Sequence, residues 1–207
     1  MKTTFIKPSV LKAFVPFCST ETTRYYICGV LIECAADSIT YVATDGHKMM
    51  VHHHEIDPCE DQFIGSLIVP NDALKKIRVN KADSIGLDIL QQLDGREFNI
   101  KLSGVSFTAI DGTFPDWRRV LPAESNPERI GHAQFNWEYL SHFWKAAKAL
   151  GLRKPAIDPA EETFPHWINF GDPNTFGVLM PLRNGYNPMT RPSWMTEQAQ
   201  AMEQIAA

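Results

Sequence analysis

The chain has 207 residues, of which 44% are hydrophobic and 21% charged, and its formal net charge at pH 7 is −4. This composition predicts a globular protein with a real core, and the negative balance argues against a protein coated in basic residues for nucleic acid. No stretch approaches the roughly 20 apolar residues of a membrane span. The N-terminal sequence MKTTFIKPSV also lacks the apolar core of a signal peptide.

The four cysteines, Cys18, Cys28, Cys34 and Cys59, lie at scattered spacings without a C-x-x-C pair. This pattern favours reduced thiols over a disulfide framework or a zinc site. We therefore expect a cytoplasmic protein with no membrane partner.

Three segments begin in the same way, with an extended apolar run followed by a helix start. They are residues 4–14, 67–77 and 133–140, and they recur at a spacing of a little over sixty residues. Pro8 and Pro70 stand where a first helical turn accepts proline, and Asn136 stands at a capping position. The spacing predicts an α+β fold in which a β-α-β-β-β unit is used three times.

Strands are predicted after each helix, because apolar and β-branched runs alternate there with turn residues. The expected strands are residues 24–34, 38–44 and 47–56, then 84–90, 97–102 and 105–110, then 166–170 and 175–182. Pro16 should end the first helix early. The polar segment 123–131 (AESNPERIG) predicts a linker, and the acidic, proline-rich segment 152–163 is ambiguous.

The predicted helices segregate charge. Residues 1–20, 73–82 and 139–157 contain no acid, although the chain as a whole is acidic. The bases there are Lys2, Lys7, Lys12, Lys75, Lys76, Arg78, Lys81, Lys145, Lys148, Arg153 and Lys154. Such faces are typical of a surface that attracts the phosphate backbone without reading sequence. Lysines that merely solubilise a helix remain the alternative.

One face of the third helix is expected to be apolar. Its members are Tyr139, Leu140, Phe143, Trp144, Ala147 and Leu150. Lys145 and Lys148 then lie on the opposite face.

The segment Thr44-Asp45-Gly46-His47 predicts a tight turn between two strands, because glycine accepts a positive φ at no steric cost. Asp45 with His47 is the nearest approach to a catalytic pair. No serine or cysteine motif supports it, and no glycine loop suited to phosphate is present. We therefore expect no enzyme activity and no cofactor.

His52, His53 and His54, with Cys59 nearby, invite a metal interpretation. Along a strand, however, His52 and His54 share one face while His53 points to the other. A closed four-ligand site is therefore not implied, and no metal is expected.

Four motifs occur in order along the chain: RYYICGVLIE at 24–33, VATDGHK at 42–48, FPDWRRVLP at 114–122 and VLMPLR at 178–183. Together they resemble the bacterial sliding clamp family, the β subunit of DNA polymerase III. The resemblance implies a DNA-clamp fold built from β-α-β-β-β units, with helices lining the interior of a ring and sheets outside. Residues 1–122 resemble the complete middle domain, which has two units. Residues 132–183 resemble half of the last domain, and residues 184–207 extend beyond the usual end.

The resemblance implies a protein without catalysis that encircles double-stranded DNA and tethers replication and repair proteins. A hydrophobic cleft would capture peptides of the DNA polymerase and the clamp loader. Carried over residue by residue, this cleft comprises Ile27, Thr44, Gly46, His47, Lys48, Met49, Pro115, Arg119, Val120, Tyr139, Val178, Met180, Pro181, Leu182 and Arg183. Lys48 stands where the family often has arginine, and Leu182 replaces a frequent methionine, so the preferred peptide can differ.

Arg24, Tyr25 and Tyr26 match family positions that touch DNA near the opening of the ring. Aromatic side chains beside an arginine are suited to stacking on bases and contacting phosphate. At least one of the two tyrosines is expected to be buried, because strand residues alternate between faces. These three residues and the helical bases other than Lys2 form the expected DNA-binding set.

The family ring has about twelve units, and this chain has three. We therefore expect self-association, with a closed homotetramer favoured. The alternative is an adaptor or decoy outside a ring, which binds the clamp-binding peptides of replication proteins without encircling DNA.

Overall fold

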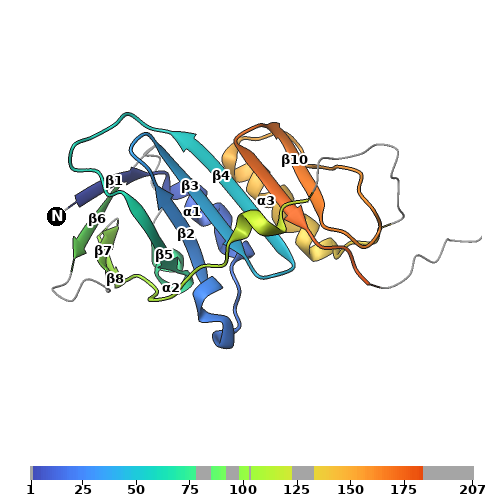
Figure 1. Ribbon diagram of the computed structural model, residues 1–207, viewed down its shortest axis with the longest axis horizontal. Helices are drawn as coiled ribbons and strands as arrows, with labels where there is room; N and C mark the ends of the chain where they lie inside the picture. Colours follow the sequence, from blue (N-terminus) through green and yellow to red (C-terminus); the bar gives the residue numbers. More distant parts are fainter. Residues whose placement is uncertain (1, 78–84, 92–97, 103, 123–132, 184–207) are drawn as a thin grey trace, which may run out of the picture.

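The computed structural model describes residues 2–77, 85–91, 98–102, 104–122 and 133–183 (Figure 1). They form a mixed fold with two antiparallel sheets. The larger sheet has seven strands in the order β5-β2-β3-β4-β11-β10-β9, and the smaller has four in the order β1-β6-β7-β8. The α+β architecture expected from the sequence is confirmed.

The elements alternate as the repeat predicts in the first two units, and in the third unit from the helix onward. The strands are β1 Lys2–Ile6, β2 Gly29–Cys34, β3 Ser38–Thr44, β4 Lys48–Glu55, β5 Gly65–Pro70, β6 Ile85–Gln91, β7 Phe98–Leu102, β8 Val105–Thr108, β9 Ala156–Ile157, β10 His166–Asp172 and β11 Thr175–Leu179. The α-helices are α1 Pro8–Phe14, α2 Asn71–Lys76 and α3 Trp137–Leu150, and the 3-10 helices are η1 Val15–Phe17, η2 Thr22–Ile27 and η3 Trp117–Val120.

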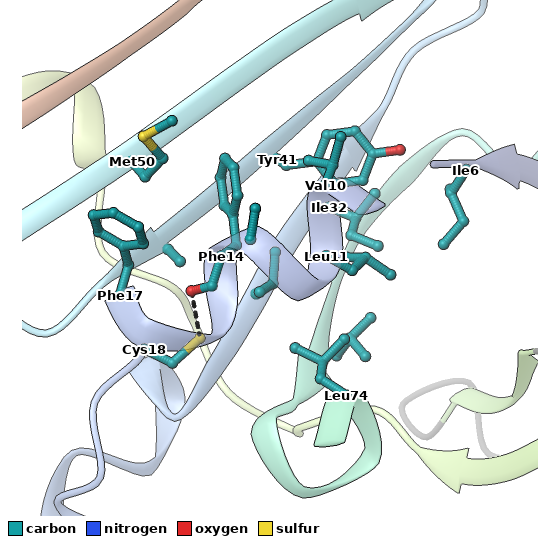
Figure 2. Close-up of a cluster of buried hydrophobic side chains, with 14 of the residues drawn as sticks. Ile6, Val10, Leu11, Phe14, Phe17, Cys18, Ile32, Tyr41, Met50 and Leu74 are labelled. Atoms are coloured by element: carbon teal, nitrogen blue, oxygen red, sulfur yellow. Dashed lines mark hydrogen bonds between the residues drawn. The ribbon is translucent and has the colours of Figure 1, made fainter. Parts of the chain in front are cut away.

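Both α1 and α3 lie behind the seven-stranded sheet in Figure 1. The core on this face is built around α1, whose Leu11 and Phe14 pack toward Ile32 and Tyr41 of the sheet (Figure 2). All four of these side chains are at most 1% exposed. Burial of large apolar side chains on this face is the main stabilising term, at roughly 1.5–3 kcal/mol for each.

The opposite face of the same sheet carries a second, smaller cluster. Val42, Met49 and Val178 of the sheet pack there with Trp117 of η3. The segment around η3 therefore covers the front of the sheet, where it is drawn in yellow-green in Figure 1. Both faces of the central strands are buried.

The helix boundaries follow the expected start and stop signals. Helix α1 ends at Phe14 and continues as a 3-10 turn that contains Pro16, so the early end is confirmed. The Asn136 side chain accepts a 2.8 Å hydrogen bond from the backbone N–H of Glu138, which confirms the predicted cap of α3. Gly151 ends α3 with a left-handed backbone.

Two predictions for the segment around Arg24 were wrong. Residues 24–27 form the 3-10 helix η2 instead of a strand, held by the Arg24 N–H to the Glu21 carbonyl and the Cys28 N–H to the Tyr25 carbonyl. The strand begins only at Gly29, where the Val69 carbonyl leaves no room for a Cβ. Neither tyrosine of this segment is buried, because η2 does not alternate between two faces.

The second basic helix is shorter than the 73–82 range that the bases suggested. It ends at Lys76 because Ile77 takes an extended backbone. Arg78 and Lys81 lie outside the described residues. The apolar run at 133–135 is not assigned to a strand, although the Leu182 N–H donates a 2.7 Å hydrogen bond to the Gln134 carbonyl.

The seven-stranded sheet contains strands from both sides of the predicted linker at residues 123–131. Strand β4 pairs with β11, so Met49 lies opposite Val178. The proposed linker and the segment 184–207 lie outside the described residues, and the division into a complete and a half domain stays a prediction. No helix in the described ranges is long and apolar enough to cross a membrane.

Candidate functional site

A cleft of about 990 Å³ opens on the face of the seven-stranded sheet that carries η3. Five separate segments surround it: η2, the β3–β4 turn, residues 114–122, residues 159–165 and the end of β11. Because β strands and short 3-10 helices hold most of these segments, the cleft is fixed by the fold and not by a single loop.

Eleven of the fifteen residues predicted for a peptide cleft line it. They are Ile27, Thr44, Gly46, His47, Lys48, Met49, Pro115, Arg119, Val120, Val178 and Met180. The other four, Tyr139, Pro181, Leu182 and Arg183, are not part of its lining. That the gathered residues bind a peptide stays a prediction.

The floor of the cleft is apolar and well packed. Met49 and Val178 are 3% and 4% exposed, and Trp117 beside them is 8% exposed. Arg118 fixes this tryptophan, since its guanidinium stacks 4.1 Å from the Trp117 ring centroid and donates two hydrogen bonds to the Glu33 carboxylate at 3.1 and 2.8 Å. The bonds to Glu33 raise the pKa of Arg118.

The β3–β4 turn forms one wall and is tightly bonded. The Asp45 carboxylate accepts hydrogen bonds from the backbone N–H groups of His47, at 2.9 Å, and Lys48, at 3.0 Å. Gly46 has a φ of +94°, a conformation that side chains disfavour. The Asp45 carboxylate therefore stabilises the turn through two backbone hydrogen bonds.

Lys48 also lines the cleft, but its ammonium group is turned to the helix side. The side chain is 4% exposed, forms an ion pair with Asp45, and places Nζ 4.4 Å from the ring centroid of Tyr139 on α3. Tyr139 thus stabilises the turn through a cation–π contact with Lys48. The Lys48 ammonium is therefore a buried cation held between Asp45 and Tyr139.

The rim combines exposed apolar side chains with charge. Val120, Phe164 and Met180 are 54%, 56% and 39% exposed, so they leave apolar surface open around the cleft. Arg24 forms an ion pair with Glu21 at 2.9 Å, and Arg119 approaches Asp116 at 3.8 Å. An apolar trough flanked by arginines suits a short extended segment with apolar side chains and polar or acidic flanks.

Several lining residues were not in the predicted set. They are Arg24, Tyr26, Phe114, Asp116, Trp117, Leu121, Pro122, Pro159, Ala160, Glu161, Phe164 and Pro165. Those from 114–122 belong to a motif already noted, and extending the set along that motif would have found them. For 159–165 the only signal was the density of prolines in a segment without periodicity.

The residues predicted to contact DNA fall into two groups. Arg24 and Tyr26 line the cleft, and Tyr25 beside them is 52% exposed. The helical bases lie on or beside the helices: Lys7 and Lys12 at α1, Lys75 and Lys76 on α2, Lys145 and Lys148 on α3, and Arg153 and Lys154 just after α3.

Helices α1 and α3 lie on one side of the molecule, since Phe17 after α1 packs 4.9 Å from Phe143 of α3, measured between ring centroids. The Lys12 ammonium reaches the Lys75 carbonyl of α2 at 3.1 Å, so α2 adjoins α1. Contact of these bases with DNA stays a prediction.

The histidine run is engaged within the sheet. The His52 Nδ1 lies 2.7 Å from the Thr175 hydroxyl, and the His53 Nδ1 lies 2.9 Å from the Thr40 hydroxyl. Burial lowers the pKa of both His52 and His54 to about 4. Among the described residues, no group of three or more potential ligands is placed to hold a metal ion.

Comparison of the sequence with known families gives a match over the part of the chain that holds η2, the β3–β4 turn and the start of the 114–122 segment. Residues 8–116 match the family model of the DNA polymerase III beta subunit, central domain. The beta sliding clamp of Vibrio cholerae is 31% identical over 108 residues, which cover 51% of this chain and 29% of that protein. The beta sliding clamp of Escherichia coli K12 is 29% identical over 136 residues, which cover 65% and 35%. The matched region thus spans about a third of the length of these relatives.

Solved structures extend the likeness of the fold over most of the chain. The DNA polymerase sliding clamp from Pseudomonas aeruginosa superposes with a TM-score of 0.66 at 18% identity, covering 88% of this chain and 67% of that one. The DNA polymerase III beta subunit from Thermotoga maritima gives a TM-score of 0.64 at 16% identity, covering 89% and 66%. The likeness includes the region after residue 116, beyond the family match.

Proposed function

The chain belongs to the DNA polymerase III β-subunit family, and from this premise we propose that it is a sliding clamp that tethers replication proteins to double-stranded DNA. The observation that carries the proposal is the apolar cleft, which gathers eleven residues from distant segments of the chain. A clamp acts by binding alone, so the proposal requires no catalytic group.

The chemistry of the cleft supports capture of a short linear peptide. Its floor is apolar, with Met49 and Val178 packed into it, and the partly exposed Met180 supplies an adaptable side chain at the rim. Arg24 and Arg119 at the edge suit polar or acidic groups that flank the apolar part of such a peptide. The expected partners are the clamp-binding peptides of a DNA polymerase and of the clamp loader.

The basic residues support an electrostatic contact with DNA. Lys145, Lys148 and Lys76 are exposed on helices α3 and α2, whereas the chain as a whole carries a formal charge of −4. Separation of charge in an acidic protein favours attraction of the phosphate backbone without sequence readout. Helices facing DNA and sheets facing outward are the arrangement we propose.

Encirclement requires several copies. Three units per chain and about twelve per ring favour a homotetramer, which we include in the proposal. The rival function is an adaptor or decoy that binds the same peptides outside a ring.

Retention on DNA of different topology separates the two functions. The protein is placed on nicked circular DNA with a clamp loader, and the fraction that remains bound is measured before and after the DNA is cut once. A sliding ring stays on the circle and leaves the linear form by its ends. Equal retention on both forms, with peptide binding intact, would instead establish the adaptor.

A further inference from the structure

The first two units of the chain complete one another by exchanging strands. Strand β1 of the first unit pairs with β6 of the second, and β5 of the second pairs with β2 of the first, both antiparallel. In each pair, the last residue of the strand that precedes a helix lies opposite the first residue of the strand that follows the other unit's helix. Ile6 thus lies opposite Ile85, and Pro70 opposite Gly29. Reciprocal pairing of this kind is what a two-fold axis between two units produces.

The third unit has a helix followed by three strands, α3, β9, β10 and β11, and among the described residues its sheet ends at β9. The Asp158 N–H points to the Trp167 carbonyl of β10. Because successive strand residues direct their backbone groups to opposite sides, the N–H and C=O of Ile157 point to the free edge. Such an edge is a template for another strand.

The extended run before α3 resembles β1 in its surroundings. The Gln134 carbonyl accepts a hydrogen bond from Leu182, which follows the last strand of the third unit. In the first unit, the Thr3 N–H of β1 donates a 3.1 Å hydrogen bond to Asp61, which follows the strand β4. Both runs are therefore held by the segment that follows their own sheet.

An apolar groove of about 450 Å³ lies beside this free edge, between α3 and β9. Its lining includes Trp137, Leu140 and Trp144 on α3 and Pro155 and Ile157 at β9. Trp137 is 83% exposed, Trp144 47% and Ile157 38%. The sequence placed Trp144 on the apolar core face of α3, but the buried positions are Phe143, Ala146 and Ala147. The two exposed tryptophans therefore form the apolar surface that α3 contributes to the groove.

We propose that a second copy of this chain covers the groove, so that the third units of two copies complete one another as the first two units do. The run 133–135 of each copy then pairs with β9 of the other, with Phe135 opposite Ala156. A two-fold axis across α3 makes the two helices antiparallel, which brings Glu138 in the first turn of one helix toward Lys148 in the last turn of the other. The inference rests on the fold and needs neither DNA nor peptide binding.

Mass measurement in solution tests this interface with the full chain. Sedimentation is measured at about 50 µM protomer, because association depends on concentration. A two-fold interface predicts an oligomer with an even number of copies. Trp144→Glu places a charge in the groove, and Ile157→Pro removes the outward N–H of β9 while proline remains acceptable at a free edge. Each should halve the mass of the assembly. Ile64→Glu changes a side chain that is 63% exposed outside the groove and should leave the mass unchanged.

A full chain that stays monomeric would overturn the proposal and leave the groove to residues 184–207 or to another protein. An unchanged mass in both groove variants, or equal dissociation of the Ile64→Glu control, would overturn it as well. Peptide binding by such a monomer would show that the failure concerns the interface and not the cleft.

Discussion

The backbone N–H of Met180 donates a 2.8 Å hydrogen bond to the carbonyl of His47. This bond continues the β4–β11 ladder, in which Leu179 lies opposite Lys48. The turn that forms one wall of the cleft and the segment that was expected to face it are thus neighbours in one sheet. The relative position of these two parts of the cleft is consequently set by main-chain bonds.

The position of Met180 at the rim leads to a prediction about affinity. Met180→Glu removes apolar contact area and adds a charge beside the apolar floor. Since burial of a methionine side chain contributes about 1.5–3 kcal/mol, the Kd for a clamp-binding peptide should rise about tenfold or more. Fluorescence anisotropy with a labelled peptide measures this. Ile64→Glu is the matched control, and an equal loss in both variants would contradict the assignment.

The buried ammonium of Lys48 leads to a prediction about stability. Lys48→Met keeps most of the side-chain volume but leaves the Asp45 carboxylate without its ion pair. A hydrogen bond to a charged group contributes about 2 kcal/mol, so the free energy of unfolding should fall by about that amount. Urea denaturation measures it. Lys145→Met removes an exposed lysine and should change stability by less than about 0.5 kcal/mol; a similar loss there would argue against a structural role for Lys48.

The histidines of β4 lead to a prediction about pH. Burial, with a smaller effect of Lys7, lowers the pKa of His52 and His54 from the ordinary 6.5 to about 4. Between these values the unfolded chain binds more protons than the folded one, so stability is full above pH 6.5 and falls as the pH drops toward 4. Asp172, which raises the pKa of His52, opposes part of this effect.

Denaturation curves recorded at several pH values in this window test the effect. The double variant His52→Gln/His54→Gln should show a flatter dependence of unfolding free energy on pH than the original chain. A slope as steep in the variant as in the original would assign the acid sensitivity to other groups.

The exposed lysines lead to a prediction about DNA binding. Lys76→Glu/Lys145→Glu should weaken binding to duplexes of any sequence and make it less dependent on salt, because each phosphate contact contributes a slope of about −0.9. Lys101 is also exposed, but it lies on β7 between Ile100 and Leu102, whose side chains are buried. Lys101→Glu therefore makes the same kind of charge change on the outward face of the smaller sheet. Equal weakening by this control would contradict a contact through the helices.

The sequence was sufficient for features with a local cause. Asp45 and Gly46 form the predicted turn, Asn136 caps α3, and Pro16 ends α1, because each of these depends on one residue and its immediate neighbours. The pattern of strands and helices was likewise predicted by hydrophobic periodicity, and the family motifs placed most of the cleft.

Features that depend on distant contacts could not be predicted in this way. The side of the sheet to which the Lys48 ammonium turns is set by Asp45 and by Tyr139 on another element. Residues 159–165 join the cleft because β9 and β10 hold them there, and their sequence has no periodic pattern. The end of α2 at Lys76 was also not indicated by the bases, which recur beyond it at Arg78 and Lys81.

The most direct test of the central claim, that this cleft captures a peptide, is a titration of three proteins with one labelled peptide. The peptide carries the clamp-binding segment of a bacterial DNA polymerase. Gly46→Trp fills the wall of the cleft, where a Cβ already comes within 2.8 Å of the Arg24 Nη1. Gly104→Trp is the control, because Gly104 also has a positive φ, +79°, but opens onto free space.

We predict that the original chain and Gly104→Trp bind the peptide with the same Kd, whereas Gly46→Trp does not bind it and keeps the same assembly mass. Unchanged binding by Gly46→Trp would contradict the placement of the peptide in this cleft.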